Sequence, residues 1–206
     1  MSQSGKKNKL IDQSYIGKIL IATSVLDKGY FSRTIIYICS HNDTGALGLI
    51  VNKPSLLNLS DVMCSNKFAN HSFYNLGYGK NYSKEAFDTP FLQGGPVEEK
   101  AFFTLHSVDS KFSNTISVTN NVCLTSHIDV YQAIASGNGP KEYINIIGYT
   151  AWYAGQLEQE IKANCWLIQE PELELLFSKD YDNKYNNAMK NMGIDPLHFI
   201  VNSGYA

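Results

Sequence analysis

The side chains that could carry chemistry gather in two short stretches of the chain. In the first, His41 lies two residues from Cys39, and strand alternation puts both on one face only if the strand continues into the following turn. A Cys–His nucleophile pair also needs surroundings that favour the thiolate and a third group that orients the histidine. The sequence indicates neither, so we expect no thiol nucleophile.

The second stretch carries Gln156, Glu158 and Glu160 on the first turns of a predicted helix. Carboxylates at this end of a helix complement the helix dipole, which accounts for them without catalysis. Glu158 and Glu160 point about 200° apart around a helix, so they cannot act as a paired general acid and base. Metal-ligand sets, phosphate loops, catalytic triads and dinucleotide fingerprints are also absent from the sequence. We therefore expect no catalytic residue, no metal and no cofactor.

Arg33 is the only arginine of the chain, and it precedes a predicted hairpin. Guanidinium is a rigid fork that can bind a carboxylate or a pair of carbonyl groups bidentately. One hypothesis is that Arg33 pairs with Glu158 or Glu160 and ties the hairpin to the helix. Breaking a buried pair of this kind by deleting one partner costs roughly 3–5 kcal/mol.

The alternative hypothesis gives Arg33 a binding role. Here Arg33, Asn52, Gly95 and Trp152 line a pocket that recognises an anionic ligand or a peptide of a partner protein. An enzymatic version of this pocket uses the backbone near Asn52, Gly94 and Gly95 as hydrogen-bond donors to an anion.

Size and composition indicate an ordinary globular protein. The chain has 206 residues, of which 44% are hydrophobic, and nothing marks a division into domains. We expect a disordered polar tail over residues 1–14 and one domain over 15–206. The four cysteines lie far apart with no metal-ligand spacing, which favours free thiols in a reducing compartment. No run is long enough for a signal peptide or a membrane span, so we expect a cytoplasmic protein.

Charge argues against direct nucleic-acid binding. The formal net charge is −2, and apart from an N-terminal trio the lysines are scattered. A large footprint on DNA needs clustered Lys and Arg side chains to displace counterions. Direct DNA binding is therefore disfavoured.

Hairpins dominate the predicted secondary structure. Residues 34–40 are rich in β-branched side chains, residues 41–45 supply turn chemistry, and residues 46–52 return as a second strand. Pro54 is predicted to end that strand because it has no N–H to donate. Further strands are predicted at 15–23, 101–107, 115–119, 122–125, 143–149 and 165–168, and residues 91–97 are predicted to form a compact strand-to-turn element.

Helices are predicted to interrupt the strands without alternating regularly with them. They are expected near 58–63 and over 126–137, 154–164, 171–177 and 180–191. Residues 65–89 are predicted to form a long surface excursion. This order indicates an α+β fold, with one mostly antiparallel mixed sheet covered by helices.

Five motifs together resemble the YqgE/AlgH family of bacterial proteins. They are F-x-R-T-I at 31–35, H-N-x-x-G-A-x-G-L-I-V-N-K-P at 41–54, G-G-P-V at 94–97, F-x-L-H at 103–106 and G-Y-x-A-W-x-x-G-Q-L-E-x-E at 148–160. The resemblance covers about residues 15 to 206 and implies a compact α+β fold with a curved, barrel-like sheet. The family's name as a transcriptional regulator rests on a regulatory association, and the resemblance implies no settled biochemical activity.

We therefore expect a non-enzymatic regulatory or accessory protein that acts through an unknown protein partner or a small anionic ligand. The alternatives are an enzyme of unrecognised mechanism and a direct DNA-binding regulator. Candidate binding residues are those that match the motifs, namely Arg33, His41, Asn52, Gly94, Gly95, Trp152, Gln156, Glu158 and Glu160. The C-terminal tip departs from the family's usual Gly-His-Ala ending, which argues against essential chemistry there.

Overall fold

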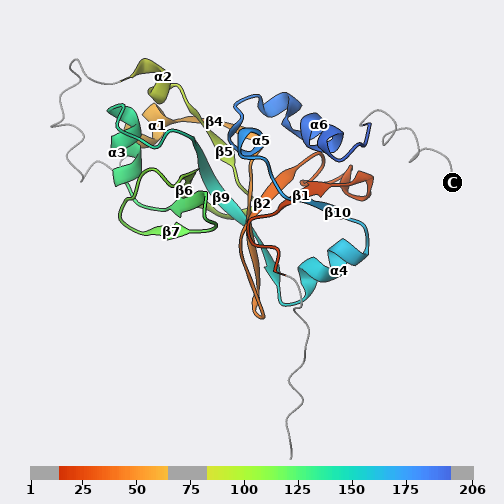
Figure 1. Cartoon of the computed structure of the whole chain (residues 1–206). Coiled ribbons are helices and arrows are strands. Elements are labelled where there is room, and N and C mark those ends of the chain that lie inside the picture. The colour runs from red at the N-terminus through yellow and green to blue at the C-terminus, as the bar shows by residue number, and fades with distance from the viewer. Residues whose placement is uncertain (1–13, 65–82, 196–206) are drawn as a thin grey trace, which may run out of the picture.

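The fold consists of ten strands and six α-helices within the part of the chain that the structure describes. The computed structural model describes residues 14–64 and 83–195 (Figure 1). The strands are β1 (Ile19–Ala22), β2 (Ile35–Asn42), β3 (Gly45–Ile50), β4 (Pro54–Asn58), β5 (Pro90–Gln93), β6 (Val97–Ser107), β7 (Thr115–Ser117), β8 (Val122–Thr125), β9 (Tyr143–Tyr153) and β10 (Trp166–Gln169). The helices are α1 (Leu59–Cys64), α2 (Lys84–Phe87), α3 (Asp129–Ala135), α4 (Gln156–Lys162), α5 (Leu173–Phe177) and α6 (Tyr181–Asn191), with a 3₁₀ turn over Ser24–Leu26.

Strand β9 is the centre of one curved sheet. Its second half pairs with β3, while its first half lies between β6 and β5. The main path of the sheet is β10-β1-β2-β3-β9-β6-β8-β7, with β5 and β4 attached to the side of β9. Every pairing is antiparallel except that of β5 with β9. The prediction of an α+β fold with a curved, mostly antiparallel mixed sheet is therefore confirmed.

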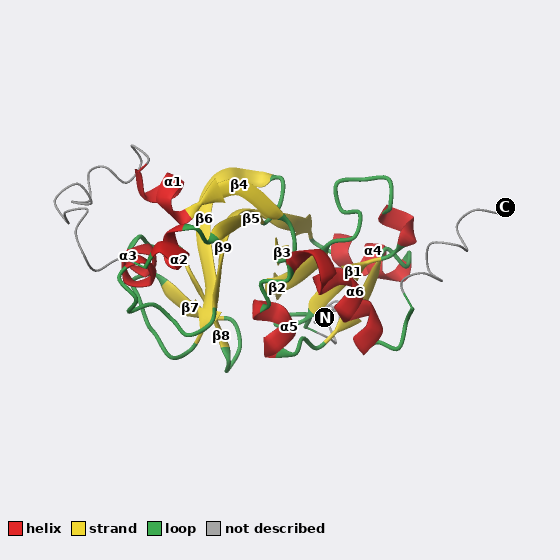
Figure 2. Ribbon diagram, turned by 90° about the horizontal axis from the view of Figure 1, so that it is seen from above, coloured by secondary structure: helices red, strands yellow, loops and turns green. Residues whose placement is uncertain are grey.

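The curvature places elements from the two ends of the sheet around a shared core. Figure 2 shows β6, β7 and β8 with α1, α2 and α3 toward one end, and β1 and β2 with α4, α5 and α6 toward the other. Gly148 has φ +72° within β9, where the strand passes from one set of partners to the other. A Cβ on Gly148 would lie 2.7 Å from the carbonyl oxygen of Gly95, so the bend requires glycine.

Strand β2 is buried on both faces, and its sequence explains how. Ile35, Tyr37 and Cys39 belong to a core cluster that includes side chains of α5 and α6. The alternate residues Ile36 and Ile38 belong to a second cluster, under α4. Because successive side chains of a strand point to opposite faces, an unbroken apolar run is what a strand covered on both sides needs.

A third core cluster lies under the short helices at the other end of the sheet. Phe91 of β5 packs against Tyr131 of α3, with ring centroids 5.6 Å apart, and against Phe102 of β6 at 5.5 Å. Val130 and Ile134, four residues apart on α3, are buried in this cluster, within the helix that was predicted over 126–137. Together the three clusters leave both faces of the sheet covered by helices.

Several predicted boundaries differ from the observed ones. The first strand begins at Ile19, and β9 continues to Tyr153, four residues beyond its predicted end. Pro54 opens β4, which was not predicted; proline is tolerated as the first residue of a strand because no ladder donor is needed there. Of the predicted surface excursion, residues 65–82 lie outside the described residues, and the rest includes α2. The predicted tail also lies outside them, except for Ser14.

Candidate functional site

Glu160 is the hub of a hydrogen-bond network on α4. Its Oε2 accepts hydrogen bonds from the indole N–H groups of Trp152 and Trp166, both at 2.8 Å. Its Oε1 accepts from the amide of Gln156 at 2.8 Å, and Gln156 in turn accepts from the backbone N–H of Tyr153 at 3.1 Å. The two indoles meet edge to face, with centroids 6.3 Å apart. Glu160 thus joins α4 to β9 and β10.

His41 contacts the same helix through Glu158, in its first turn. Its Nδ1 accepts a hydrogen bond from the backbone N–H of Tyr15 at 3.2 Å, and its Nε2 lies 2.8 Å from Glu158 Oε1. Because Nδ1 is an acceptor, the ring proton is on Nε2 and is donated to the carboxylate. The ring of Tyr15 packs over the imidazole at 5.0 Å. Both nitrogens of this buried histidine are therefore engaged.

Cys39 and His41 lie on opposite faces of the sheet. The strand does continue to the turn, but its register shifts between Ile38 and Ser40, and this bulge turns His41 toward α4. Cys39 remains in the core cluster with α5 and α6, where burial raises the pKa of its thiol. A thiolate is disfavoured there, and the two residues cannot form a nucleophile pair.

Arg33 does not reach either glutamate, so the predicted ion pair is wrong. Its guanidinium lies over the ring of Tyr185 in α6, 4.6 Å from the centroid, and Nη2 donates to Asn186 Oδ1 at 2.7 Å. Glu158 and Glu160 are instead satisfied by a histidine and two indoles. Sequence alone could not show this, because α6 is more than 140 residues away along the chain.

Asn52, Gly94 and Gly95 are positioned as parts of the framework. The Asn52 amide donates to the carbonyl of Arg33 at 2.9 Å, and its Oδ1 accepts from the N–H of Ile35 at 2.8 Å. The N–H of Gly94 donates to the carbonyl of Ile147 at 2.8 Å. That donor is therefore unavailable for an anion, contrary to the predicted anion-binding role of this turn.

The four residues of the predicted pocket are not brought together around one cavity. Trp152 lies in the core under α4, whereas Arg33 is exposed beside α6. Gly95 is packed against the backbone of β9, where a Cβ would overlap the carbonyl of Tyr149. The predicted common pocket is wrong. None of its four residues lines any of the hollows described next.

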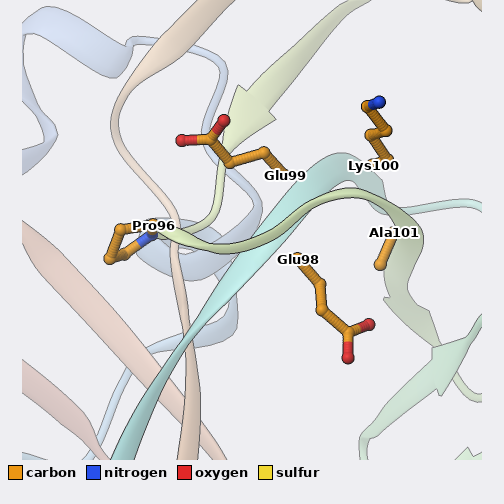
Figure 3. Close-up of a pocket in the computed structure, with 5 residues that line it drawn as sticks. All are labelled: Pro96, Glu98, Glu99, Lys100 and Ala101. Atoms are coloured by element: carbon orange, nitrogen blue, oxygen red, sulfur yellow. The ribbon is translucent and has the colours of Figure 1, made fainter.

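An open hollow of about 690 Å³ follows the Gly94–Gly95 turn (Figure 3). It is lined by Pro96, Glu98, Glu99, Lys100 and Ala101, in the part of β6 that bulges away from β9. Figure 3 shows the carboxylates of Glu98 and Glu99 on opposite sides of the ribbon. They are therefore not a carboxylate pair for acid–base work.

Two further hollows lie on either side of Lys179. One, of about 220 Å³, is bounded by α2, the end of α3 and Tyr143; the other, of about 550 Å³, is bounded by α5. The ammonium of Lys179 lies 5.6 Å from the centre of the Tyr143 ring. Each hollow is lined by a serine, a glutamate and Lys179, but among the described residues no hydrogen bond or ion pair joins these side chains into a catalytic set.

Two buried basic residues were not predicted as site residues. Lys184 of α6 is 1% exposed, and its Nζ donates to the carbonyls of Val51 and Leu176 at 2.9 and 3.0 Å. Burial lowers the pKa of Lys184 to about 7. Its sequence signal is its place on the apolar face of α6, between Tyr181 and Ala188 at helical spacing.

His106 is the second. Its Nε2 lies 2.8 Å from Thr125 Oγ1, which lies 2.6 Å from Thr115 Oγ1, and its Nδ1 lies 2.8 Å from the carbonyl of Ser107. The carbonyl can only accept, so the proton is on Nδ1 and Nε2 accepts from Thr125. Burial lowers the pKa of His106, which keeps the ring neutral. The F-x-L-H motif had marked this histidine without indicating a role.

Within residues 14–64 and 83–195, no group of three or more His, Cys, Asp or Glu side chains is placed to hold a metal ion. None of the four cysteines forms a disulfide bond. None of the described helices is long and apolar enough to cross a membrane.

Known proteins similar to this chain match most or all of its length. A family model described as AlgH-like matches residues 19–197. A UPF0301 protein of Rhizobium etli is 36% identical over 206 residues, covering 100% of both chains. One of Rickettsia canadensis is 37% identical over 191 residues, covering 92% of this chain and 95% of its own.

Solved structures agree with the fold. The solution structure of the AlgH protein from Pseudomonas aeruginosa superposes with a TM-score of 0.71 at 28% identity, covering 100% of both chains. A crystal structure of a Corynebacterium diphtheriae protein superposes with a TM-score of 0.67 over 94% of each chain. At 15% identity, this second match indicates the shared fold alone.

Proposed function

The chain belongs to the AlgH-like family, and we propose that it is a non-enzymatic, cytoplasmic accessory protein that acts by binding a protein partner or a small anionic ligand. One observation carries the proposal. The side chains that could do chemistry in its motifs are hydrogen-bonded to one another inside the fold, whereas the guanidinium of Arg33 stays exposed.

The internal network argues against acid–base catalysis by the residues of the motifs. Glu160 accepts three hydrogen bonds, and His41 uses both ring nitrogens. A general base must be within reach of a proton on its substrate. The His41 lone pair that could accept such a proton, on Nδ1, already accepts a hydrogen bond from the backbone N–H of Tyr15. Using either residue would require dismantling contacts that hold α4 in place.

Arg33 supports binding because most of its donors are unused. A guanidinium carries five N–H groups, and among the described residues only Asn186 accepts from this one. The side chain is held against a ring, so binding an anion costs little conformational entropy. A regulatory role, on this proposal, is exerted through the bound partner and not through direct contact with DNA.

Native mass spectrometry and a turnover screen together test the proposal. We expect no turnover of generic esters, phosphate esters or nucleotides, and a reproducible excess mass or a captured partner that is lost in Arg33→Gln. A matched Lys162→Gln variant, at an exposed position of α4, should behave as wild type. Turnover that is abolished by His41→Phe or Lys184→Met would overturn the proposal.

A further inference from the structure

Resting on the proposed function and narrowing it, we propose that Arg33, Tyr30 and Lys53 form a docking face for a carboxylate side chain in an acidic segment of a partner protein. The three residues surround one turn between β1 and β2 and the chain just after β3. We call them the Arg33 face.

The guanidinium of Arg33 is fixed before any partner arrives. It lies 4.6 Å from the centre of the Tyr185 ring, and Tyr185 is itself buried, donating its hydroxyl to the carbonyl of Ala22 at 2.7 Å. The 2.7 Å bond to Asn186 sets the rotation of the fork about the ring. A rigid fork with free N–H groups is one half of a bidentate guanidinium–carboxylate pair.

The backbone of Arg33 is also fixed, by hydrogen bonds of Asn52. Its φ of +53° is left-handed, a conformation that costs a non-glycine residue about 1–3 kcal/mol. The Asn52 amide holds it there by bonding both to the carbonyl of Arg33 and to the N–H of Ile35. Strain of this kind persists only where surrounding structure over-determines it, and such positions cluster at ligand clamps.

Lys53 and Tyr30 extend the face on the other side of the turn. Lys53 Nζ donates to the carbonyl of Tyr30 at 2.5 Å and lies 5.4 Å from the centre of its ring. The Tyr30 side chain is 40% exposed and meets Phe31 edge to face at 5.2 Å. Tyrosine and arginine are among the residue types that dominate binding energy at protein interfaces, and here both lie in the turn before β2.

No carboxylate of the described chain neutralises this face. Two carboxylates act on its aromatic neighbours: besides burial, the charge of Asp27 contributes to raising the pKa of Tyr185, and that of Glu99 contributes to raising the pKa of Tyr30. Neither comes within 4.0 Å of the Arg33 or Lys53 nitrogens. The face therefore presents two cations without counter-ions, and an acidic segment complements it.

The shape of the face favours a protein over a small ligand. Small-molecule sites are concave and bury most of their ligand, whereas Arg33 is exposed and Tyr30 is 40% exposed. Two cations are also too few for a nucleic-acid footprint. An exposed tyrosine beside a fixed arginine offers what a protein segment needs, an apolar contact next to a charged one.

The test uses the fact that Arg33 is the only arginine, so its Nε–Hε group gives a single arginine cross-peak in the NMR spectrum of ¹⁵N-labelled protein. The full chain is titrated at constant ionic strength with end-blocked hexaglutamate, hexaglutamine and hexalysine, and with acetate and inorganic phosphate. Hexaglutamate should move the peak along a saturable curve, and hexaglutamine, of the same length without charge, should leave it in place. Acetate and phosphate should move it only at much higher concentration.

Variants locate the effect. Lys53→Gln should weaken the response to hexaglutamate about threefold, as expected for loss of an exposed charge contact, and Lys162→Gln should leave it unchanged. Equal weakening by both variants would mean general electrostatic attraction and would overturn the proposal. So would a peak that no peptide moves, or one that acetate or phosphate moves at the concentration that works for hexaglutamate.

The outcomes separate this inference from the function on which it rests. If no peptide moves the Arg33 cross-peak but the Arg33→Gln variant still captures a partner, the proposed Arg33 face is wrong and the accessory function stands. If turnover is found that His41→Phe or Lys184→Met abolishes, the accessory function fails whether or not the peak moves.

Discussion

Glu158 Oε1 lies 2.8 Å from His41 Nε2, and this hydrogen bond joins the end of β2 to the first turn of α4. The same imidazole accepts from the N–H of Tyr15, just before β1. One ring thus ties together a strand, a helix and the entry to the sheet. Tyr15 and His41 are 26 residues apart in the sequence, and His41 and Glu158 are 117 apart, so only the fold brings them together.

His41→Phe should destabilise the protein by about 1–3 kcal/mol, because it keeps the ring but leaves the Tyr15 N–H without its acceptor. Glu158→Gln should cost less, since an amide oxygen can still accept from Nε2. Urea unfolding followed by fluorescence measures both, because Trp152 and Trp166 are the only tryptophans and both pack beside α4. Equal costs for the two variants would contradict this account of the histidine.

Glu160→Leu should cost about 2–4 kcal/mol, because the indole N–H groups of Trp152 and Trp166 would lose the acceptor they share. The emission of both tryptophans should change in the folded state as well. Gln159→Leu, at the exposed neighbouring position of α4, is the matched control and should stay within about 0.5 kcal/mol of wild type. A Glu160→Leu protein as stable as this control would rule out the network as a stabilising element.

Gly95→Ala should be among the most damaging single changes, costing more than about 3 kcal/mol or preventing folding. A Cβ at this position would overlap the backbone carbonyl of Tyr149, which cannot move without disturbing β9. Gly137→Ala is the comparison, because its φ of +74° is also left-handed but nothing lies within 4 Å of the added carbon. It should cost about 1 kcal/mol. Similar melting temperatures for the two variants would refute the close approach.

Arg33→Gln should change the free energy of unfolding by less than about 1 kcal/mol, because the exposed guanidinium makes one side-chain hydrogen bond and one ring contact. Arg33→Gly should be at least as stable as Arg33→Gln, since glycine adopts φ +53° without strain. A loss of several kcal/mol in both variants, measured by chemical unfolding, would restore a buried structural role for this residue.

Local patterns predicted much of the fold. The β-branched run of β2 and the turn chemistry after it gave the hairpin, because both signals lie within a few residues of each other. The helix predicted over 154–164 is α4, and Leu157 and Ile161, four residues apart, pack in one core cluster. Strand β4 was missed because its Leu56 and Leu57 are exposed and its proline looked like a strand end.

The candidate site was predicted less well, because its contacts are long-range. The motif residues were identified, but the partners of Arg33 and His41 were not. A single sequence shows which side chains could bond, and not which of several acceptors the fold brings within 3 Å. The bulge after Ile38 is a further example, because one extra residue reversed the face on which His41 was expected.

Lys184 shows how the fold can override a residue's usual preference for the surface. It is almost completely buried, and its two acceptors match the two N–H groups of a neutral amine. No carboxylate of the described residues pairs with it. Burial therefore lowers its pKa from 10.5 to about 7, the largest such change among the described lysines.

This pKa predicts how stability depends on pH. Between about pH 7 and 10.5 the unfolded chain holds the Lys184 proton and the folded chain does not, so the free energy of unfolding should rise with pH. The limiting slope is about 1.4 kcal/mol per pH unit, and the gain stops below pH 7, where both states are protonated. Denaturant unfolding at pH 7.5 and 9.5 should show a gain of roughly 2–3 kcal/mol that Lys184→Met abolishes.

Lys190→Met is the matched control, because Lys190 lies on the exposed side of the same helix. It should keep the pH dependence of the wild type, and other groups that titrate at high pH contribute equally to all three proteins. The comparison therefore isolates one proton. If Lys184→Met and wild type show the same slope between pH 7.5 and 9.5, the buried amine is charged in the folded protein, and its two carbonyl partners must then be sufficient to hold an ammonium ion.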